Sequence, residues 1–326
     1  MLFAEAIRAL IGAGSAGVGQ VAIALCILML PPTVISVRSH RPWIFAAHEF
    51  ACMSDEAPAE IGSFLAAVAQ AECQAVGKAL ANRRNRHRAI HEARKAIRRL
   101  RSLLALIRDS VGDDTSGIER ALRLQAKRLS ALRDTHVIVA VAEKLAADDD
   151  TGAWTTAVQA LVERRDTLLA DELAKDPGFA RRRAAMGDLA TALEKLHWGR
   201  ITADAVRRAV KKSQRRVLRA EHDAMQTPTS NHLHRWRRSA RRLRLQLITV
   251  AALNASHGTK VHLADAHRGK STKALAHLTD RLGRCQDIQV LRSSLKTLGD
   301  PSILPALRKR LRVEMKLAKH QPFVHR

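Results

Sequence analysis

The sequence predicts an all-α protein made of two similar halves. Ala, Leu, Arg, Glu and Lys recur at helical spacing after residue 55, whereas Gly, Pro and alternating β-branched runs are sparse there. An arginine-rich segment that begins at His91 also recurs, nearly unchanged, at His234, a separation of 143 positions (234 − 91). We therefore expect two tandem four-helix bundles, related by a pseudo-two-fold axis, around a basic cleft.

The first 52 residues are expected to lie outside this helical domain, which spans residues 53–326. Residues 9–37 carry no charged side chain, so this extension is hydrophobic. We favour an upstream over-extension of the true start at Met53. A membrane anchor with Arg38 and Arg41 on its cytoplasmic side is the alternative. Glu5 argues against a secretory signal, and the glycine motif at Gly12 lacks the preceding strand of a dinucleotide site.

The helices of the two halves follow the same order. The first half, residues 58–180, is predicted to hold helices near 58–81, 85–110, 116–147 and 153–175. Polar residues around Asp113 and Asp148 suit the N-caps that separate them. The second half, residues 200–326, repeats the order near 202–225, 229–254, 259–297 and 302–320. A further match, of the segment at Leu132 with the segment at Cys285, is offset by 153 positions (285 − 132), which indicates a longer second hairpin near Asn254.

Each copy of the repeated segment is predicted to form a helix with one cationic face and one apolar face. Residues at i, i+3, i+4 and i+7 share a face of a helix. The cationic faces therefore combine His91, Arg94, Arg98 and Arg101 in the first copy, and His234, Arg237, Arg241 and Arg244 in the second. The apolar faces, expected to pack inside the protein, combine Ile97, Leu100, Leu104 and Ile107, and Trp236, Ala240, Leu243 and Leu247.

The charge of the chain indicates a polyanionic partner. Lys and Arg exceed Asp and Glu by 25, and the sequence pI is near 11.2. Ordinary solvated helix faces interleave acids with bases, but residues 228–264 contain no acid and residues 83–101 contain only Glu92. Arg also predominates over Lys in both copies, and its planar guanidinium suits phosphate oxygens. A negative ligand is therefore expected on the cationic faces.

Neither a metal centre, a cofactor nor an enzyme active site is predicted. The four cysteines are far apart, which suits a reducing compartment rather than a disulfide framework. His87 and His91 have the spacing of metal ligands, but their arginine neighbours would repel a cation. The basic stretches contain neither an acidic cluster nor the E-x-E-x-K pattern of triphosphate tunnel enzymes.

The repeated pattern resembles that of the CHAD family, the conserved histidine α-helical domain. The resemblance covers residues 58–325 and includes the Arg133-Asp134 motif that follows the first copy. It implies two four-helix bundles around a basic channel that binds inorganic polyphosphate without catalysis. It also implies a ligand-facing set of His91, Arg94, Arg98, Arg99, Arg101, His234, Arg237, Arg241, Arg242 and Arg244. To this set we add two further cations of the repeated segments, Lys95 and Arg238. The second copy departs from the family pattern at Cys285-Gln286-Asp287, where no contact like that of Arg133 is assumed.

The third helix of each half is expected to add cations to the cleft. Arg120 matches Lys273 and Arg128 matches Arg281, both 153 positions apart. Lys127 and Arg133 are added from the first copy alone. We assign Asp134 and Asp287 to orienting arginines or capping rather than to catalysis, and we expect bound phosphate to raise the pKa of the two repeat histidines.

Inorganic polyphosphate is the favoured partner and nucleic acid the alternative. The chain has no Tyr and only 3% aromatic residues, whereas proteins that bind single-stranded nucleic acid stack bases on aromatic side chains. No helix-turn-helix, zinc-finger or RNP pattern occurs in the sequence. A membrane is a partner only if residues 1–52 form an anchor. The expected location is the cytoplasm, in association with polyphosphate granules.

Overall fold

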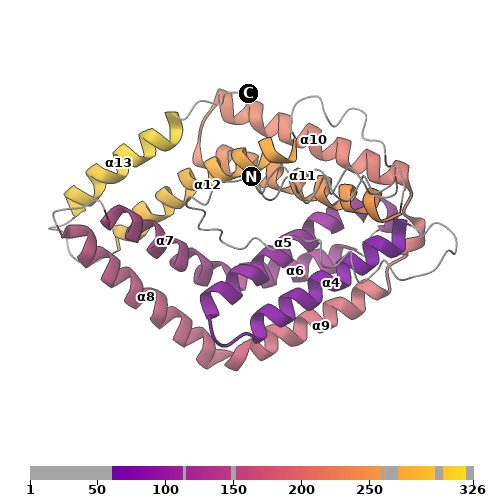
Figure 1. Ribbon diagram of the computed structural model, residues 1–326, viewed down its shortest axis with the longest axis horizontal. Helices are drawn as coiled ribbons and strands as arrows, with labels where there is room; N and C mark the ends of the chain where they lie inside the picture. Colours follow the sequence, from indigo (N-terminus) through magenta and orange to yellow (C-terminus); the bar gives the residue numbers. More distant parts are fainter. Residues whose placement is uncertain are drawn as a thin grey trace, which may run out of the picture. The chain divides into compact units, whose positions relative to one another are not determined.

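The computed structural model describes residues 61–112, 115–147, 152–257, 261, 271–297 and 304–320. This part of the chain contains ten α-helices, two short 3-10 helices and no strand (Figure 1), which confirms the predicted all-α class. Residues 1–52, on which the start-site and anchor alternatives depend, lie outside it. Among the described helices, none combines the length and apolar character that a membrane crossing requires.

The helices of the first half begin and end close to the predicted positions. They are α4 (Ile61–Ala81), α5 (Arg86–Val111), α6 (Thr115–Arg128), α7 (Ser130–Ala146) and α8 (Ala153–Lys175). The predicted third helix near 116–147 is thus two helices, α6 and α7, that meet at Leu129. Backbone hydrogen bonds continue through this point, from Leu129 N to Gln125 O (3.2 Å) and from Arg133 N to Leu129 O (3.3 Å).

The second half has four helices, and one further helix lies between the halves. The four are α10 (Ala203–Gln226), α11 (Ser230–His257), α12 (Thr272–Leu295) and α13 (Leu304–His320). The start of the predicted third helix, before residue 271, lies largely outside the described residues. The link between the halves contains η2 (Pro177–Phe179), α9 (Ala180–Glu194) and η3 (Trp198–Arg200). The sequence did not predict α9, which buries Met186, Leu189 and Leu193 at helical spacing.

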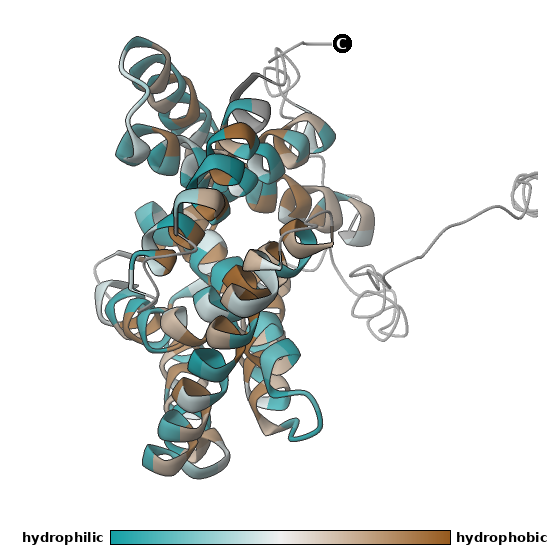
Figure 2. Cartoon of the chain, turned by 90° about the vertical axis from the view of Figure 1, so that its left-hand side faces the viewer, coloured by the Kyte–Doolittle hydropathy of each residue, from teal (hydrophilic) through white to brown (hydrophobic). Residues whose placement is uncertain are grey.

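Local sequence signals fix the ends of the helices that carry the repeated segments. Asn85 Oδ1 accepts a hydrogen bond from Arg88 N (2.9 Å) and caps the start of α5. Gly112 ends α5 with a φ of 78°, a left-handed conformation that favours glycine. Apolar and polar residues occupy different sides of the individual helices, as the brown and teal bands of Figure 2 show. Each amphipathic helix can therefore bury one face and expose another.

Two apolar cores hold the helices together, and each core combines both halves of the sequence. The first core joins α4, α5, α6 and α9 with α10 and α11. The second joins α7 and α8 with α13 and the C-terminal part of α12. We expected a separate four-helix bundle for each half, but the halves share their cores. Because α5 contacts both α10 and α11, the first cationic helix lies against the second half of the protein.

The predicted apolar faces of the two repeated helices are inside the first core. Ile97, Leu100, Leu104 and Ile107 of α5 are at most 1% exposed. On α11, Trp236, Ala240 and Leu243 are at most 3% exposed, and Leu247 is partly buried against the same core. Burial of these faces orients α5 and α11 and thereby decides where their arginines point.

Candidate functional site

The backbones of the two repeated helices touch at Ser102. Its Oγ donates a hydrogen bond to the carbonyl oxygen of Arg242 (3.0 Å), and Gln246 Nε2 donates to the carbonyl oxygen of Ser102 (3.3 Å). Ser102 and Gln246 are both buried. Their hydrogen bonds satisfy backbone groups at a helix contact and hold the cationic segments of α5 and α11 close together.

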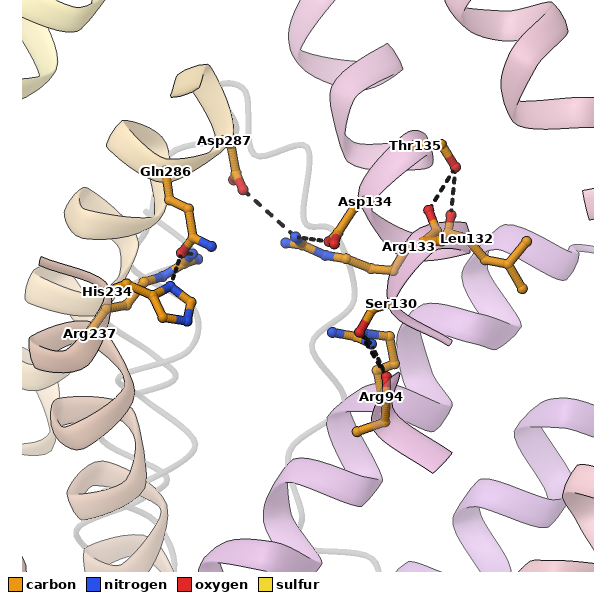
Figure 3. Close-up of polar contacts among 12 residues, drawn as sticks. Arg94, Ser130, Leu132, Arg133, Asp134, Thr135, His234, Arg237, Gln286 and Asp287 are labelled. Carbon is orange, nitrogen blue, oxygen red and sulfur yellow. Dashed lines mark hydrogen bonds and ion pairs between the residues drawn. The ribbon is translucent and has the colours of Figure 1, made fainter. Parts of the chain in front are cut away.

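The first arginine of each cationic face is held by the third helical segment of its own half. Arg94 Nη1 donates to the carbonyl oxygen of Ala126 (2.6 Å) and to Oγ of Ser130 (2.8 Å; Figure 3). In the second half, Arg237 Nε donates to the carbonyl oxygen of Thr279 (3.2 Å). Ala126 and Thr279 are 153 positions apart (279 − 126). The offset of the sequence repeat therefore recurs in the contacts of the two arginines.

Gln286 distinguishes the second half from the first. It stands 153 positions after Arg133 (286 − 133) and supplies an acceptor where the first half has a cation. Gln286 Oε1 accepts from Arg237 Nη1 (2.7 Å) and lies 2.9 Å from Nδ1 of His234 (Figure 3). The sequence analysis assumed no arginine-type contact at this position, and the structure places a hydrogen-bond acceptor there.

Arg133 extends from α7 toward the second half. Its Nη1 lies 3.0 Å from Asp134 Oδ1 and 3.7 Å from Asp287 Oδ1 of α12 (Figure 3). Burial raises the pKa of Asp287, and the neighbouring Arg133 and Arg237 act in the opposite direction. Both aspartates that the sequence analysis singled out therefore lie beside arginines.

The two halves contribute to one group of arginines, which we call the central arginine cluster: Arg94, Arg98, Arg133, Arg237 and Arg241. Burial lowers the pKa of Arg98 to about 10, helped by the charges of Arg94, Arg133 and Arg237. Burial likewise lowers the pKa of Arg241 to about 9, with repulsion from Arg237, Arg98 and Arg133. Arg98 and Arg241 are repeat equivalents, 143 positions apart (241 − 98). Mutual repulsion across the two halves makes this cluster unfavourable without a negative partner.

The two repeat histidines are uncharged near neutral pH in the free protein. Burial lowers the pKa of His91 to about 4, and Arg98, Lys95 and Arg133 add repulsion. Burial also lowers the pKa of His234, which lies near Arg238, Arg237 and Arg241. From the sequence, we expect bound phosphate to raise these pKa values. In the free protein the surroundings shift them in the other direction.

Arg99 faces a different partner from its repeat equivalent Arg242. Arg99 Nε lies 2.7 Å from Oε1 of Glu72 on α4, whose side chain is only 7% exposed. This contact is a buried ion pair, which places Arg99 in the packing of α4 against α5 and not in the central cluster. Burial lowers the pKa of Arg242, and Arg216 of α10 is the largest source of added repulsion.

The remaining predicted residues lie at several places. Arg101 is half-buried and lies close enough to Arg123 and Arg238 to be repelled by both. Lys95 pairs with Glu92 (3.1 Å), and Arg120 lines a cavity with Arg108 and Arg123. Arg244 is half-buried on α11, and burial lowers the pKa of the half-buried Arg281 on α12. Four further members are exposed: Lys127, Arg128, Arg238 and Lys273.

His87 contacts an imidazole instead of a metal-ligand partner on its own helix. Its ring stacks on that of His136, with 4.8 Å between centroids and 2° between planes. Its Nε2 lies 3.6 Å from Asp166 Oδ1. In the described part of the chain, no group of three or more His, Cys, Asp or Glu residues has the arrangement of a metal site.

Sequence reasoning missed two cations beside Arg242. Arg108 lies seven positions after Arg101 (108 − 101), so an extended helical stripe would have included it. Arg216 belongs to the basic run of α10, which lies outside the repeated segment. Both repel Arg242, and the packing of α10 against α11 and α5 brings Arg216 to this place.

The fold and these contacts define the class: an all-helical protein with duplicated cationic helices that share one arginine cluster. The chain belongs to the CHAD family, because the sequence pattern of the CHAD domain matches residues 66–296, more than half of the 326 residues. No curated protein matches the chain.

Two solved structures have a similar fold. One is the crystal structure of the CHAD domain from the plant Ricinus communis, with 20% identity and a TM-score of 0.60, over 83% of this chain and 90% of that one. The other is PptA from Streptomyces chartreusis, with 14% identity and a TM-score of 0.53, over 80% of this chain and 97% of that one. At these identities the likeness concerns the fold.

Proposed function

We propose that this protein binds inorganic polyphosphate, without catalysis, at the central arginine cluster. The observation that carries the proposal is the convergence of Arg98 and Arg241 from equivalent positions of the two halves, each with a lowered pKa. A pseudo-two-fold relation between the halves would place both at the middle of one basic cleft. The cleft and its symmetry are parts of the proposal.

The electrostatics of the cluster support an anionic ligand. Partly buried like charges cost free energy, because little water remains to screen their repulsion. Asp134, Asp280 and Asp287 offset this cost only in part, because the pKa of Arg241 is still lowered to about 9. A chain of phosphate groups would replace the lost hydration and supply acceptors for the guanidinium donors. Affinity is therefore expected to fall steeply with salt concentration.

The kinds of side chain available favour polyphosphate over nucleic acid. Polyphosphate offers charge and oxygen atoms but no bases, so it requires no stacking platform. Trp154 and Trp236 are at most 2% exposed and cannot stack with bases, and the chain contains no Tyr. Single-stranded nucleic acid would gain about 1–3 kcal/mol per base from such stacking. Nucleic acid remains the second outcome that the experiment distinguishes.

The proposal includes no catalytic role, because three carboxylates near the cationic helices lie beside arginines. Asp134 and Asp287 lie beside Arg133. Glu72 pairs with Arg99, and burial raises its pKa while Arg99 opposes that shift. Hydrolysis assisted by a bound metal ion would need carboxylates that are free to hold the metal beside the ligand.

The experiment is calorimetric titration of the full chain with long-chain polyphosphate, with duplex DNA at equal phosphate concentration as competitor. Tight binding that DNA does not displace is expected. Changing Arg98→Ala and Arg241→Ala together should weaken binding at least about a hundredfold, since hydrogen bonds to charged groups contribute about 1.5–3 kcal/mol each. A fluorescent fusion should locate in the cytoplasm at polyphosphate granules.

The matched control removes two exposed arginines far from α5 and α11 in the sequence: Arg183→Ala on α9 and Arg312→Ala on α13. This variant has the same net charge as the cluster variant, and its polyphosphate affinity should change less than threefold. Equal losses in the two variants, or displacement of polyphosphate by DNA, would mean that a general basic surface binds anions and would contradict the proposal.

A further inference from the structure

The cationic stripe of α5 continues beyond the central arginine cluster. Arg101 lies close enough to Arg94 to repel it, so it adjoins that cluster. Two turns later, Arg108 occupies the same face of the helix and is 44% exposed. From Arg94 to Arg108 the stripe covers 14 positions (108 − 94), which corresponds to about 21 Å along a helix axis.

The far part of this stripe meets cations from two other helices. Arg242 of α11 is half-buried, and Arg216, Arg101 and Arg108 all repel it. The hydrogen bond from Ser102 Oγ to the carbonyl oxygen of Arg242 (3.0 Å) holds α5 and α11 together at this place. We call Arg101, Arg108, Arg216 and Arg242 the second arginine cluster.

Packing alone does not explain the second arginine cluster. Arg99, the repeat equivalent of Arg242, has the buried carboxylate of Glu72 as its partner. Among the described residues, no carboxylate forms such a pair with Arg242, although the charge of Glu119 opposes the lowering of its pKa. Glu119 forms ion pairs with both Arg108 and Arg123.

The second arginine cluster is accessible to a ligand. Arg216 and Arg108 are exposed, and Arg101 and Arg242 are half-buried. The nearby Asp109 pairs with Lys212 of α10 (2.8 Å). The charges of Arg108 and Arg216 also lower its pKa, so Asp109 and Glu119 both lie near the four arginines. Four converging guanidinium groups beside these two carboxylates keep an excess of positive charge, which suits phosphate oxygens.

We propose that the second arginine cluster is a second phosphate-binding site, joined to the central cluster through Arg101, so that one long polyphosphate chain occupies both. This inference rests on the proposed function of the central cluster and extends it to Arg108 and Arg216. Two joined sites make the second contact intramolecular, which increases the affinity for a polymer long enough to span them. Tripolyphosphate is too short to span about 21 Å of helix and binds each cluster separately.

The test compares long-chain polyphosphate with tripolyphosphate in calorimetric titrations of the full chain. The unchanged protein should bind two tripolyphosphate ions per chain. The variant Arg216→Ala/Arg242→Ala should bind one, with unchanged affinity at the remaining site, and its affinity for long-chain polyphosphate should fall at least tenfold. The Arg183→Ala/Arg312→Ala variant should match the unchanged protein with both ligands.

Two results would overturn the inference: one tripolyphosphate per unchanged chain, or a long-chain affinity that changes less than twofold in Arg216→Ala/Arg242→Ala. Failure of the proposed function looks different, because Arg98→Ala/Arg241→Ala would then bind long-chain polyphosphate as the unchanged protein does. The single variant Arg216→Ala serves as a control in case the double variant misfolds. Arg216 is exposed, so this variant is expected to fold. It should already lower the long-chain affinity severalfold and reduce its salt dependence.

Discussion

A Cβ atom placed on Gly283 of α12 would lie 2.5 Å from Nη2 of Arg237 on α11. The guanidinium group of Arg237 therefore lies directly over the glycine, between the carbonyl of Thr279 and the amide of Gln286. In the first half, the position equivalent to Gly283 holds Ser130, 153 positions earlier (283 − 130), whose Oγ accepts from Arg94. In the first half, the hydroxyl group of Ser130 thus positions Arg94. In the second half, Gly283 has no side chain and leaves room for Arg237.

Gly283→Ala is expected to displace Arg237 and weaken polyphosphate binding. The added methyl group collides with the end of a flexible side chain, so the helix can fold while the guanidinium moves. Loss of the hydrogen bonds that orient it should lower affinity about tenfold, which corresponds to about 1.4 kcal/mol. Titration calorimetry measures the affinity, and thermal unfolding verifies the fold.

The matched control for this prediction is Gly187→Ala in α9. Gly187 is also inside a helix, but a Cβ placed there meets nothing within 4 Å. Replacing an exposed helical glycine by alanine should stabilise the protein by about 0.5–1 kcal/mol and leave polyphosphate affinity unchanged. If Gly283→Ala behaves in the same way, Arg237 does not need its observed position.

The ion pair of Arg99 with Glu72 is expected to stabilise the fold without contributing to ligand binding. Removing one partner of a buried pair leaves an uncompensated charge and costs about 3–5 kcal/mol. Arg99→Met alone should therefore lower the melting temperature strongly, and Arg99→Met/Glu72→Gln should recover much of the loss. Chemical unfolding of the single and double variants measures the coupling.

Polyphosphate binding separates this structural role from a ligand role. The resemblance to the CHAD family implies that Arg99 contacts the ligand. The geometry predicts that folded Arg99→Met/Glu72→Gln binds long-chain polyphosphate within about threefold of the unchanged protein, a difference of about 0.6 kcal/mol. A loss of affinity of tenfold or more would show that Arg99 belongs to the binding site.

Periodicity and duplication predicted most of the helices and both apolar faces, because these features follow from local spacing. They did not predict how the cores are shared. The spacing of Ile97 and Trp236 predicts buried faces. It does not predict that α5 packs against α10 and α11. The same limit applies to the site. The helical face shared by Arg98 and Arg101 was predictable, whereas the meeting of Arg242 with Arg216 depends on tertiary packing.

Asp287→Asn is expected to strengthen polyphosphate binding and weaken the fold. Asp287 Oδ1 lies 3.7 Å from Nη1 of Arg133 and offsets the repulsion of the central arginine cluster. Without this carboxylate, the free protein should melt at a lower temperature in low salt, while the affinity for the polyanion should rise severalfold. Asp166→Asn is the control, because Asp166 is 53% exposed and pairs with Arg165 away from this cluster. An unchanged affinity in Asp287→Asn would show that Asp287 does not compete with the ligand.

Acidification is expected to destabilise the free protein through His91. Burial and nearby cations lower the pKa of His91 to about 4, whereas an exposed histidine titrates near about 6.5. Between these values the unfolded state binds the additional proton, so this histidine's contribution to stability decreases as pH falls from about 6.5 to 4. His91→Gln should therefore show a smaller fall in melting temperature over this range than the unchanged protein.

Bound polyphosphate should reverse this effect, because its negative charge raises the pKa of His91. Binding then takes up a proton at pH 5–6, and affinity increases as pH falls from 7 toward 5. Calorimetry in buffers of different ionisation enthalpy measures that uptake directly. His91→Gln should lose part of the uptake, whereas His222→Gln on the exposed side of α10 should retain all of it. Equal uptake in the two variants would mean that the ligand does not reach the surroundings of His91, which would place polyphosphate away from the N-terminal part of α5.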